Sequence, residues 1–378
     1  MDFALTDDQQ AIRDLFHRFA ADEIRPQAQA LDRDPRFPEE LFAQAGELGF
    51  FGMRYPEPEG NGSDLLSYLL AVEELSWGSL AVAAACTMQS LMGTFFVHRF
   101  ATGEVRQRLV APALAGQVKG TICMTEPDAG SDLFSMRTSA EERDGTWHLS
   151  GQKTWITSAP MADMFTVFAR TGDKELSIFL VEQGAPGLSV GRFIEKMGVR
   201  ASLTSEVSFD NTPATCLLGK VGAGIPALRE VLAEIRLMTA AMALGVARAA
   251  YEDAVSYSLE RAQFGKPIAR FQAVQEHIAE MRTKLEAARQ LTHWAAWRST
   301  QGLENTDQAS MAKLYASEAA MEICDRAARI LASYGFANEY PIERYLRDAR
   351  FTIIGGGTSE ILRVNIARGT TRSWQGQA

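Results

Sequence analysis

Helical periodicity dominates the first third of the chain. Thr6 and Gln9 form a capping-box pattern that predicts the start of a helix. Apolar residues then recur at the spacing of one helix face: Ile12, Leu15, Phe16 and Phe19. Apart from a Pro/Gly-rich loop at residues 55–62, the chain remains rich in good helix formers. We therefore predict an all-α domain over residues 1–118.

From residue 119 to residue 222 the pattern changes to short apolar runs separated by turn residues. Runs with the length and composition of strands lie at residues 164–169, 177–181, 188–190 and 205–209. Asp144-Gly145 is a hairpin signal, and Asp210-Asn211 predicts a second turn. We predict a compact β domain over residues 119–222.

Helical periodicity returns after a glycine-rich link. Long helical stretches are predicted at residues 228–245, 271–300, 307–333 and 358–368. Four long helices that follow one another favour an antiparallel bundle, which we assign to residues 223–378. The predicted fold class is mainly α with a central β domain.

Composition narrows the class of partner. The 378 residues include 38 Lys+Arg and 47 Asp+Glu, and the net charge of -9 argues against nucleic acid and membrane partners. Four scattered cysteines without a CxxC pair and five isolated histidines predict no metal site. The weakly charged stretch at residues 79–97 contains several polar residues and predicts a core helix. An acidic start, unlike a signal peptide, favours a cytoplasmic protein.

Two segments of the predicted β domain carry groups suited to a flat, polar cofactor. The segment TEPDAGSD, residues 125–132, offers hydroxyls and backbone N–H groups to a phosphate or a ring edge. The segment KTWITS, residues 153–158, places the Trp155 indole between hydroxyl-bearing residues. A single tryptophan is more often a core residue than a stacking platform, but the two segments together are specific.

These segments resemble the TEPGAGSD and WITNG motifs of the acyl-CoA dehydrogenase family. Further blocks match in the family's order: LERAQFGKPIARFQAVQ at residues 259–275, GFANEYPIERYLRDAR at 335–350 and GGGTSEILRVNIARG at 355–369. The resemblance covers essentially the whole chain. It implies a helical N-terminal domain, a middle β barrel and a C-terminal four-helix bundle, assembled as a homotetramer or a homodimer.

The resemblance also implies a non-covalent FAD held across a subunit interface. Thr125 and Thr157 would meet the isoalloxazine edge, Trp155 would cover the ring, and Ser131 would meet the pyrophosphate and the acyl carrier. The other cofactor positions that it implies are Ile122, Met124, Ile156, Arg261, Phe264, Gln272, Ser333, Thr358 and Glu360. Arg261, Phe264 and Gln272 would come from the neighbouring subunit. Ser333 lies in the segment RILAS, which stands where many relatives have QxxGG.

The family reaction needs a base that removes a proton from Cα of a thioester while hydride leaves Cβ for the flavin. In most relatives the base is a Glu directly before the GT of the last block, and Gly356 holds that position here. A branch resembling isovaleryl-CoA and long-chain dehydrogenases instead has the catalytic Glu directly before an Arg of the first C-terminal helix. If Arg236 corresponds to that Arg, Ile235 occupies the position of the Glu. Glu234 is one residue off, about 100° around a helix. It is either a surface acid or a base that a local register slip returns to the site.

Substrate contacts are expected from Ser131, Met92, Met238, Arg236 and Gly356, and the apolar lining favours an apolar acyl group on CoA or on an acyl-carrier protein. Three functions stay open. The first is an FAD-dependent acyl thioester α,β-dehydrogenase with a non-standard base and an electron-transfer flavoprotein as acceptor. The second is a non-oxidative elimination, cyclisation or desulfination. The third is a non-catalytic subunit that supplies part of an FAD site.

Overall fold

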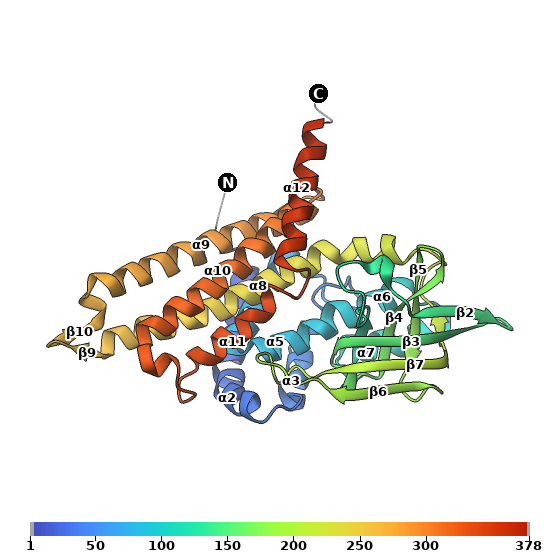
Figure 1. Ribbon diagram of the computed structural model, residues 1–378, viewed down its shortest axis with the longest axis horizontal. Coiled ribbons are helices and arrows are strands. Elements are labelled where there is room, and N and C mark those ends of the chain that lie inside the picture. Colours follow the sequence, from blue (N-terminus) through green and yellow to red (C-terminus); the bar gives the residue numbers. More distant parts are fainter. Residues whose placement is uncertain (1–3, 376–378) are drawn as a thin grey trace.

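The computed structural model describes residues 4–375, in which the sheet lies at one end of the molecule and the long C-terminal helices extend toward the other (Figure 1). The N-terminal helices are α1 (Asp7–Phe19), η1 (Ala20–Ile24), α2 (Arg25–Arg33), α3 (Glu39–Glu47), η2 (Phe50–Gly52), α4 (Leu65–Gly78), α5 (Leu80–Thr87), η3 (Met88–Gly93), α6 (Phe95–Phe100) and α7 (Gly103–Leu114). Thr6 and Gln9 form the predicted capping box of α1. Among the described residues, one helical stretch, Leu80–Phe100, is long and apolar enough to cross a membrane, but 89% of its apolar window is buried inside the structure. A core helix fits this burial.

The central sheet contains the four predicted strands and four more. Its strands are β1 (Gly120–Cys123), β2 (Ser139–Arg143), β3 (Thr146–Thr157), β4 (Met164–Gly172), β5 (Glu175–Glu182), β6 (Leu188–Phe193), β7 (Thr204–Pro213) and β8 (Cys216–Leu217). They follow the order β6-β7-β3-β2-β4-β5-β8, and β1 pairs in parallel with β4. Short 3-10 turns lie at η4 (Leu133–Ser135) and η5 (Ala159–Met161).

One predicted turn is correct and the other is wrong. Asp144 and Gly145 join β2 to β3 with positive φ angles of 50° and 79°. At Asp210-Asn211, however, β7 continues without reversing. Asn211 has φ of 49°, and the register with β3 shifts at this place. The two residues form a bulge, because β3 continues to pair with the residues on both sides of them.

The C-terminal region contains the four predicted long helices. Its elements are α8 (Gly224–Glu260), β9 (Ala262–Gln263), β10 (Lys266–Pro267), η6 (Ile268–Arg270), α9 (Gln272–Thr300), α10 (Thr306–Leu331), η7 (Ala332–Gly335), α11 (Ile342–Thr352) and α12 (Ser359–Gln375). The sequence patterns did not predict α11, which packs against α10 and α8. The end of α12 projects from the rest of the molecule (Figure 1).

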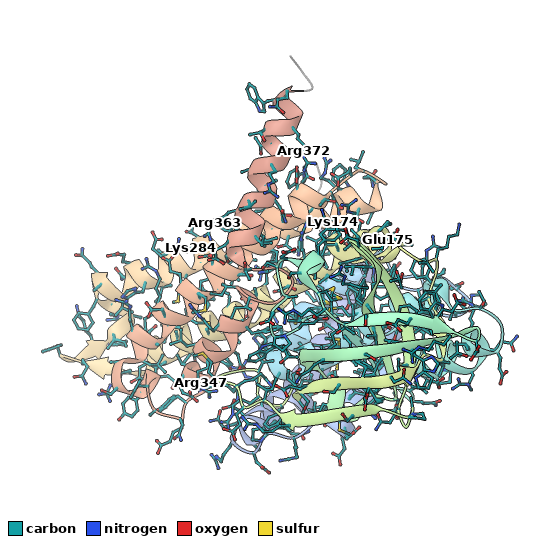
Figure 2. The ribbon with its side chains drawn as sticks, turned by 45° about the vertical axis from the view of Figure 1, so that its right-hand side comes forward. Lys174, Glu175, Lys284, Arg347, Arg363 and Arg372 are labelled. Carbon is teal, nitrogen blue, oxygen red and sulfur yellow. The ribbon has the colours of Figure 1, made fainter. Side chains whose placement is uncertain are left out.

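Helix α11 fastens the three regions together. Arg347 lies where the C-terminal helices approach the strands (Figure 2), and its guanidinium is 2.6 Å from Asp32 of α2 and 2.8 Å from the Met197 carbonyl after β6. Next to it, Asp348 accepts a hydrogen bond from the Val199 N–H. A Cβ added at Gly198 would lie 2.3 Å from the Arg347 carbonyl, so only glycine fits there. These contacts hold the end of α11, and with it the start of the segment that contains Gly356, in a defined position.

The π-helix η3 joins the N-terminal region to the sheet. The Gln89 side chain donates to the carbonyls of Ala113 and Val118, each at 2.8 Å, and accepts from the Gly120 N–H at 2.7 Å. A Cβ at Gly93 would lie 2.3 Å from the Gly120 carbonyl. This close approach places η3, which carries Met92, beside the start of β1.

Candidate active site

A buried ion pair joins the two cofactor segments. Lys153 Nζ lies 2.8 Å from Glu126 Oε1, with 0% and 4% of the two side chains exposed. Glu126 also accepts the N–H groups of Arg137 and Thr138, at 2.6 and 2.9 Å. Although burial opposes its charge, these hydrogen bonds and Lys153 hold the pKa of Glu126 below its ordinary value. Sequence patterns assigned no role to this pair, because Lys153 lies among other polar residues of β3 and gives no signal of its burial.

The strand β3 bulges at Trp155 and turns its indole outward. Trp155 has φ of 59°, and the register with β7 shifts between Lys153 and Ile156. The indole residue is 56% exposed, whereas Ile156 is buried in the core of the sheet. An outward aromatic face of this kind suits a flat ring.

Polar groups border this face. The Thr154 N–H donates to the Thr125 carbonyl at 2.9 Å, and the Thr157 carbonyl accepts the Thr121 hydroxyl at 2.6 Å. The Ser158 hydroxyl is buried and has no hydrogen-bond partner within the described residues. Such an orphaned donor next to an exposed aromatic face fits a ligand with polar ring edges, as an isoalloxazine has.

The remaining expected cofactor residues divide into two distant groups. Ile122, Met124 and the exposed Ser131 belong to the sheet region. Arg261, Phe264 and Gln272 surround the β9–β10 hairpin at the opposite end of the molecule (Figure 1), and Phe264 is 94% exposed.

Ser333 belongs to the hairpin end, because the neighbouring Tyr334 ring lies 5.9 Å from the Arg261 guanidinium. At the start of α12, hydrogen bonds from its own N–H and from Thr358 lower the pKa of the exposed Glu360. One chain therefore does not bring the two groups together.

The two positions at which the family carries its base lie against each other. Gly356 follows α11 with φ of 69°, and a Cβ built on it would lie 3.7 Å from the Ile235 carbonyl oxygen. Ile235 is 6% exposed, and its side chain belongs to the main hydrophobic core. Neither residue has a group that can take up a proton.

Glu234 is engaged by an arginine from the N-terminal region. Arg54 Nη2 lies 2.7 Å from one carboxylate oxygen and Nε 3.0 Å from the other, with the two side chains 18% and 24% exposed. The helix α8 is α-helical from Gly224 to Glu260, so it contains no register slip. The register slip expected for Glu234 is therefore wrong, and its carboxylate is a partly buried member of an ion pair instead of a solvated surface acid. Sequence analysis missed Arg54 because the pair spans 180 residues.

Two buried cations lie on the α10 side of the base positions. Arg236 is 5% exposed and donates from Nη1 to Ser310 Oγ at 2.9 Å. Lys313 Nζ donates to the Gly357 carbonyl at 2.6 Å, and burial lowers the pKa of Lys313 to about 8. Lys313 thus fixes the turn that contains Gly356, and the Arg236 side chain is directed to α10. The apolar residues Met238 and Met242 are buried on the same helix.

Comparison with known sequences decides the family. Profiles described as "Acyl-CoA dehydrogenase" match in three parts: the N-terminal domain at residues 6–117, the middle domain at 121–212 and the C-terminal domain at 222–371. The chain belongs to the acyl-CoA dehydrogenase family. It is an oxidoreductase that acts on CH–CH groups, and its cofactor is FAD.

Individual relatives match over nearly their full length. Benzylmalonyl-CoA dehydrogenase from Aromatoleum aromaticum is 57% identical over 97% of this acyl-CoA dehydrogenase and 99% of the relative. A solved structure from work on the electron transferring flavoprotein of Acidaminococcus fermentans has 38% identity and a TM-score of 0.95, over 98% of this chain and 100% of that chain. The structure of PigA with FAD and proline has 29% identity and a TM-score of 0.94, over 98% and 99% of the two chains.

Proposed function

We propose that this acyl-CoA dehydrogenase oxidises an acyl-CoA that bears a carboxylate on Cα, and that loss of CO2 replaces removal of the α-proton. The observation that carries the proposal is the contact between Gly356 and Ile235, two residues without an ionisable group. Loss of a positioned base lowers a rate by about 10²- to 10⁴-fold. The electrons at Cα must therefore come from a bond other than Cα–H.

The name of the 57% identical relative, benzylmalonyl-CoA dehydrogenase, supplies such a bond. A malonyl thioester bears a carboxylate on Cα, and cleavage of the Cα–carboxylate bond leaves its electron pair on Cα. That pair forms the Cα=Cβ bond as a hydride leaves Cβ, and the products are CO2 and an α,β-unsaturated acyl-CoA. Bound FAD supplies the two-electron acceptor for the hydride.

The residues of this chain have separate parts in the proposal. Trp155 covers the flavin, and Thr125 and Thr157 border its polar edge. The buried apolar side chains of Met238 and Met242, on the same helix as Ile235, suit an aryl or alkyl group. Glu234 has no part in proton transfer, because Arg54 holds its carboxylate at two points.

We further propose that the second half of each FAD site comes from another copy of the chain, through Arg261, Phe264 and Gln272. The distance between the two groups along the molecule (Figure 1) and the 94% exposure of Phe264 support this assembly. A homotetramer, a cytoplasmic location and an electron-transfer flavoprotein as acceptor complete the proposal. Anaerobically reduced enzyme mixed with an electron-transfer flavoprotein or with oxygen would identify the acceptor by the rate of flavin reoxidation.

Two substrates that differ only in the carboxylate test the reaction. Benzylmalonyl-CoA, mixed anaerobically with the FAD-loaded enzyme, should bleach the flavin and release CO2 in equal amount, whereas 3-phenylpropionyl-CoA should not. Equal bleaching by 3-phenylpropionyl-CoA would show that a base exists and would overturn the proposal. Product formation at constant flavin redox state would instead establish non-oxidative chemistry. Purification without flavin in the absence of a second protein would favour a non-catalytic subunit.

A further inference from the structure

The space next to Gly356 is already taken by a hydroxyl group. A Cβ built on Gly356 would lie 2.6 Å from Thr239 Oγ1 and 3.4 Å from Thr239 Cβ. The first distance is shorter than real Cβ contacts, so a side chain at this position requires the hydroxyl to move. Thr239 is 2% exposed and donates from Oγ1 to the Ile235 carbonyl at 2.9 Å. Because a β-branched side chain in a helix has few rotamers, the position of this oxygen is fixed, whereas its hydrogen can still rotate about the Cβ–Oγ1 bond.

Thr239 therefore meets both base positions at once. It lies one helical turn after Ile235 on α8, and its hydroxyl faces the α-carbon of Gly356. A threonine hydroxyl has one donor and two acceptor sites, so it can turn from a helix carbonyl to a ligand oxygen.

We propose that Thr239 determines the specificity of this enzyme for acyl thioesters with a carboxylate on Cα. At position 356, where φ of 69° already strains any side chain, its hydroxyl also occupies the space that a Cβ would need, and it donates a hydrogen bond to the carboxylate of the substrate. The inference rests on the proposed function and names the residue that enforces it.

A neutral donor suits this reaction better than a cation. Negative charge leaves the carboxylate as the Cα–carboxylate bond breaks, so a cation on the carboxylate would stabilise the ground state more than the transition state. Among the nearby cations, Arg54 is paired with Glu234 and Lys313 donates to the Gly357 carbonyl. Arg236 donates from Nη1 to Ser310, and its buried Nε has no partner within the described residues. The hydroxyl of Thr239 can orient the carboxylate without opposing its departure.

The donor part of the proposal is tested by removing the hydroxyl. Thr239→Val should lower kcat/KM for benzylmalonyl-CoA by about 10- to 100-fold, the effect of one hydrogen bond to a charged group. Thr239→Ser, which keeps the hydroxyl, should lie between wild type and Thr239→Val. The matched control is Thr292→Val in α9, which removes an equally buried hydroxyl that also donates to the carbonyl one turn earlier, at 2.8 Å. Full activity of Thr239→Val would overturn this part.

The steric part is tested by restoring the base. Gly356→Glu alone should give no flavin reduction with 3-phenylpropionyl-CoA, because the new Cβ meets Thr239 Oγ1. Gly356→Glu combined with Thr239→Ala removes that atom at the same backbone φ of 69°, so it should gain at least about 10²-fold in flavin reduction over the single variant. Equal gain in the single variant, or no gain in a double variant that retains FAD and the wild-type melting temperature, would overturn it.

The wild-type assay tests the proposed reaction, and the variants of Thr239 and Gly356 test the role of Thr239 separately. If wild-type enzyme does not reduce its flavin with benzylmalonyl-CoA, the proposed function fails. The gain of 3-phenylpropionyl-CoA oxidation by the double variant would still show that Thr239 excludes a base. FAD content and the melting temperature of each variant report on folding independently of turnover.

Discussion

The flavin platform and the base region treat buried charge in opposite ways. At the platform, the carboxylate of Glu126 is paired with Lys153 and with two backbone N–H groups. In the base region, a glycine, an isoleucine and a hydroxyl occupy the positions where a carboxylate would act, and Arg236 and Lys313 donate to neutral oxygens. The comparison teaches that a buried carboxylate is kept where a lysine and two backbone N–H groups compensate its charge, and that the proposed base positions contain no ionisable group.

The largest expected effect comes from breaking the platform. Lys153→Met leaves the Glu126 carboxylate buried without its cation, and removal of one member of a buried pair destabilises a protein by about 3–5 kcal/mol. We expect a loss of that size in the free energy of unfolding, measured by denaturant titration, and a lower flavin-to-protein absorbance ratio.

Two variants calibrate this result. Glu126→Gln combined with Lys153→Met removes both charges and should recover part of the lost stability. Arg143→Met removes one member of the exposed pair with Glu141 and should change stability by less than about 1 kcal/mol. A Lys153→Met protein as stable as Arg143→Met would contradict the role of the buried pair.

Asp348 allows a second test of how buried charge is compensated, because it is a buried carboxylate that no lysine among the described residues pairs with as Lys153 pairs with Glu126. Burial raises its pKa to about 6 from 3.8, against the hydrogen bond from the Val199 N–H. The folded protein therefore binds more protons than the unfolded chain between these values, and this contribution to stability is lost as the pH rises through about 6.

Asp348→Asn keeps an acceptor for Val199 and abolishes the titration. Between about pH 4 and pH 7, the melting temperature of the variant should rise relative to that of wild type. The corresponding change in the difference between their free energies of unfolding is roughly 2–3 kcal/mol. A difference that does not change with pH would show that Asp348 titrates normally.

Trp155→Ala tests the exposed face of the platform. Loss of an aromatic stack weakens binding by up to about 1.5 kcal/mol, so the Kd for FAD should rise by no more than about tenfold. Stability of the apoprotein should be nearly unchanged, because the residue is 56% exposed. Trp147→Ala is the contrasting variant: its ring packs 5.3 Å from Phe179, so stability should fall while flavin affinity is kept. The reverse pattern would contradict our assignment of the two tryptophans.

The smallest effect is expected at Glu234. Glu234→Gln retains an acceptor for Arg54 and should lower flavin reduction by benzylmalonyl-CoA by less than about tenfold, whereas loss of a base would lower it by about 10²- to 10⁴-fold. Stopped-flow absorbance under anaerobic conditions measures the rate. Glu230→Gln, which loses a surface pair with Arg99, is the control. A drop of the larger size in Glu234→Gln alone would restore Glu234 as the base.

Sequence patterns predicted the elements better than the contacts between them. Apolar periodicity located α8, α9 and α10 because each helix buries a face along its own length. The turn predicted at Asp210-Asn211 was wrong because a bulge and a turn use the same residues, and only pairing with β3 distinguishes them.

The decisive contacts of the site join distant parts of the chain. Helical spacing places Thr239 on the face of Ile235, but its meeting with Gly356 depends on how α8 packs against the turn after α11. The contact between Arg54 and Glu234 also joins distant parts of the chain, and the types of these two residues alone predict only two surface charges. The two proposed cofactor segments could be grouped from sequence because each is a short local motif, and the structure joins them through the pair Lys153–Glu126.

The β9–β10 hairpin has a genetic consequence. The Trp155 face and the Arg261 group of one chain lie at opposite ends, so in the proposed assembly every flavin is shared by two chains. A chain that lacks Trp155 and a chain that lacks Arg261 are then each defective alone, but a mixed oligomer contains one site with both residues intact. Two alleles that each weaken FAD binding should therefore complement each other when they are expressed in one cell, which a defect confined to a single-chain site does not allow.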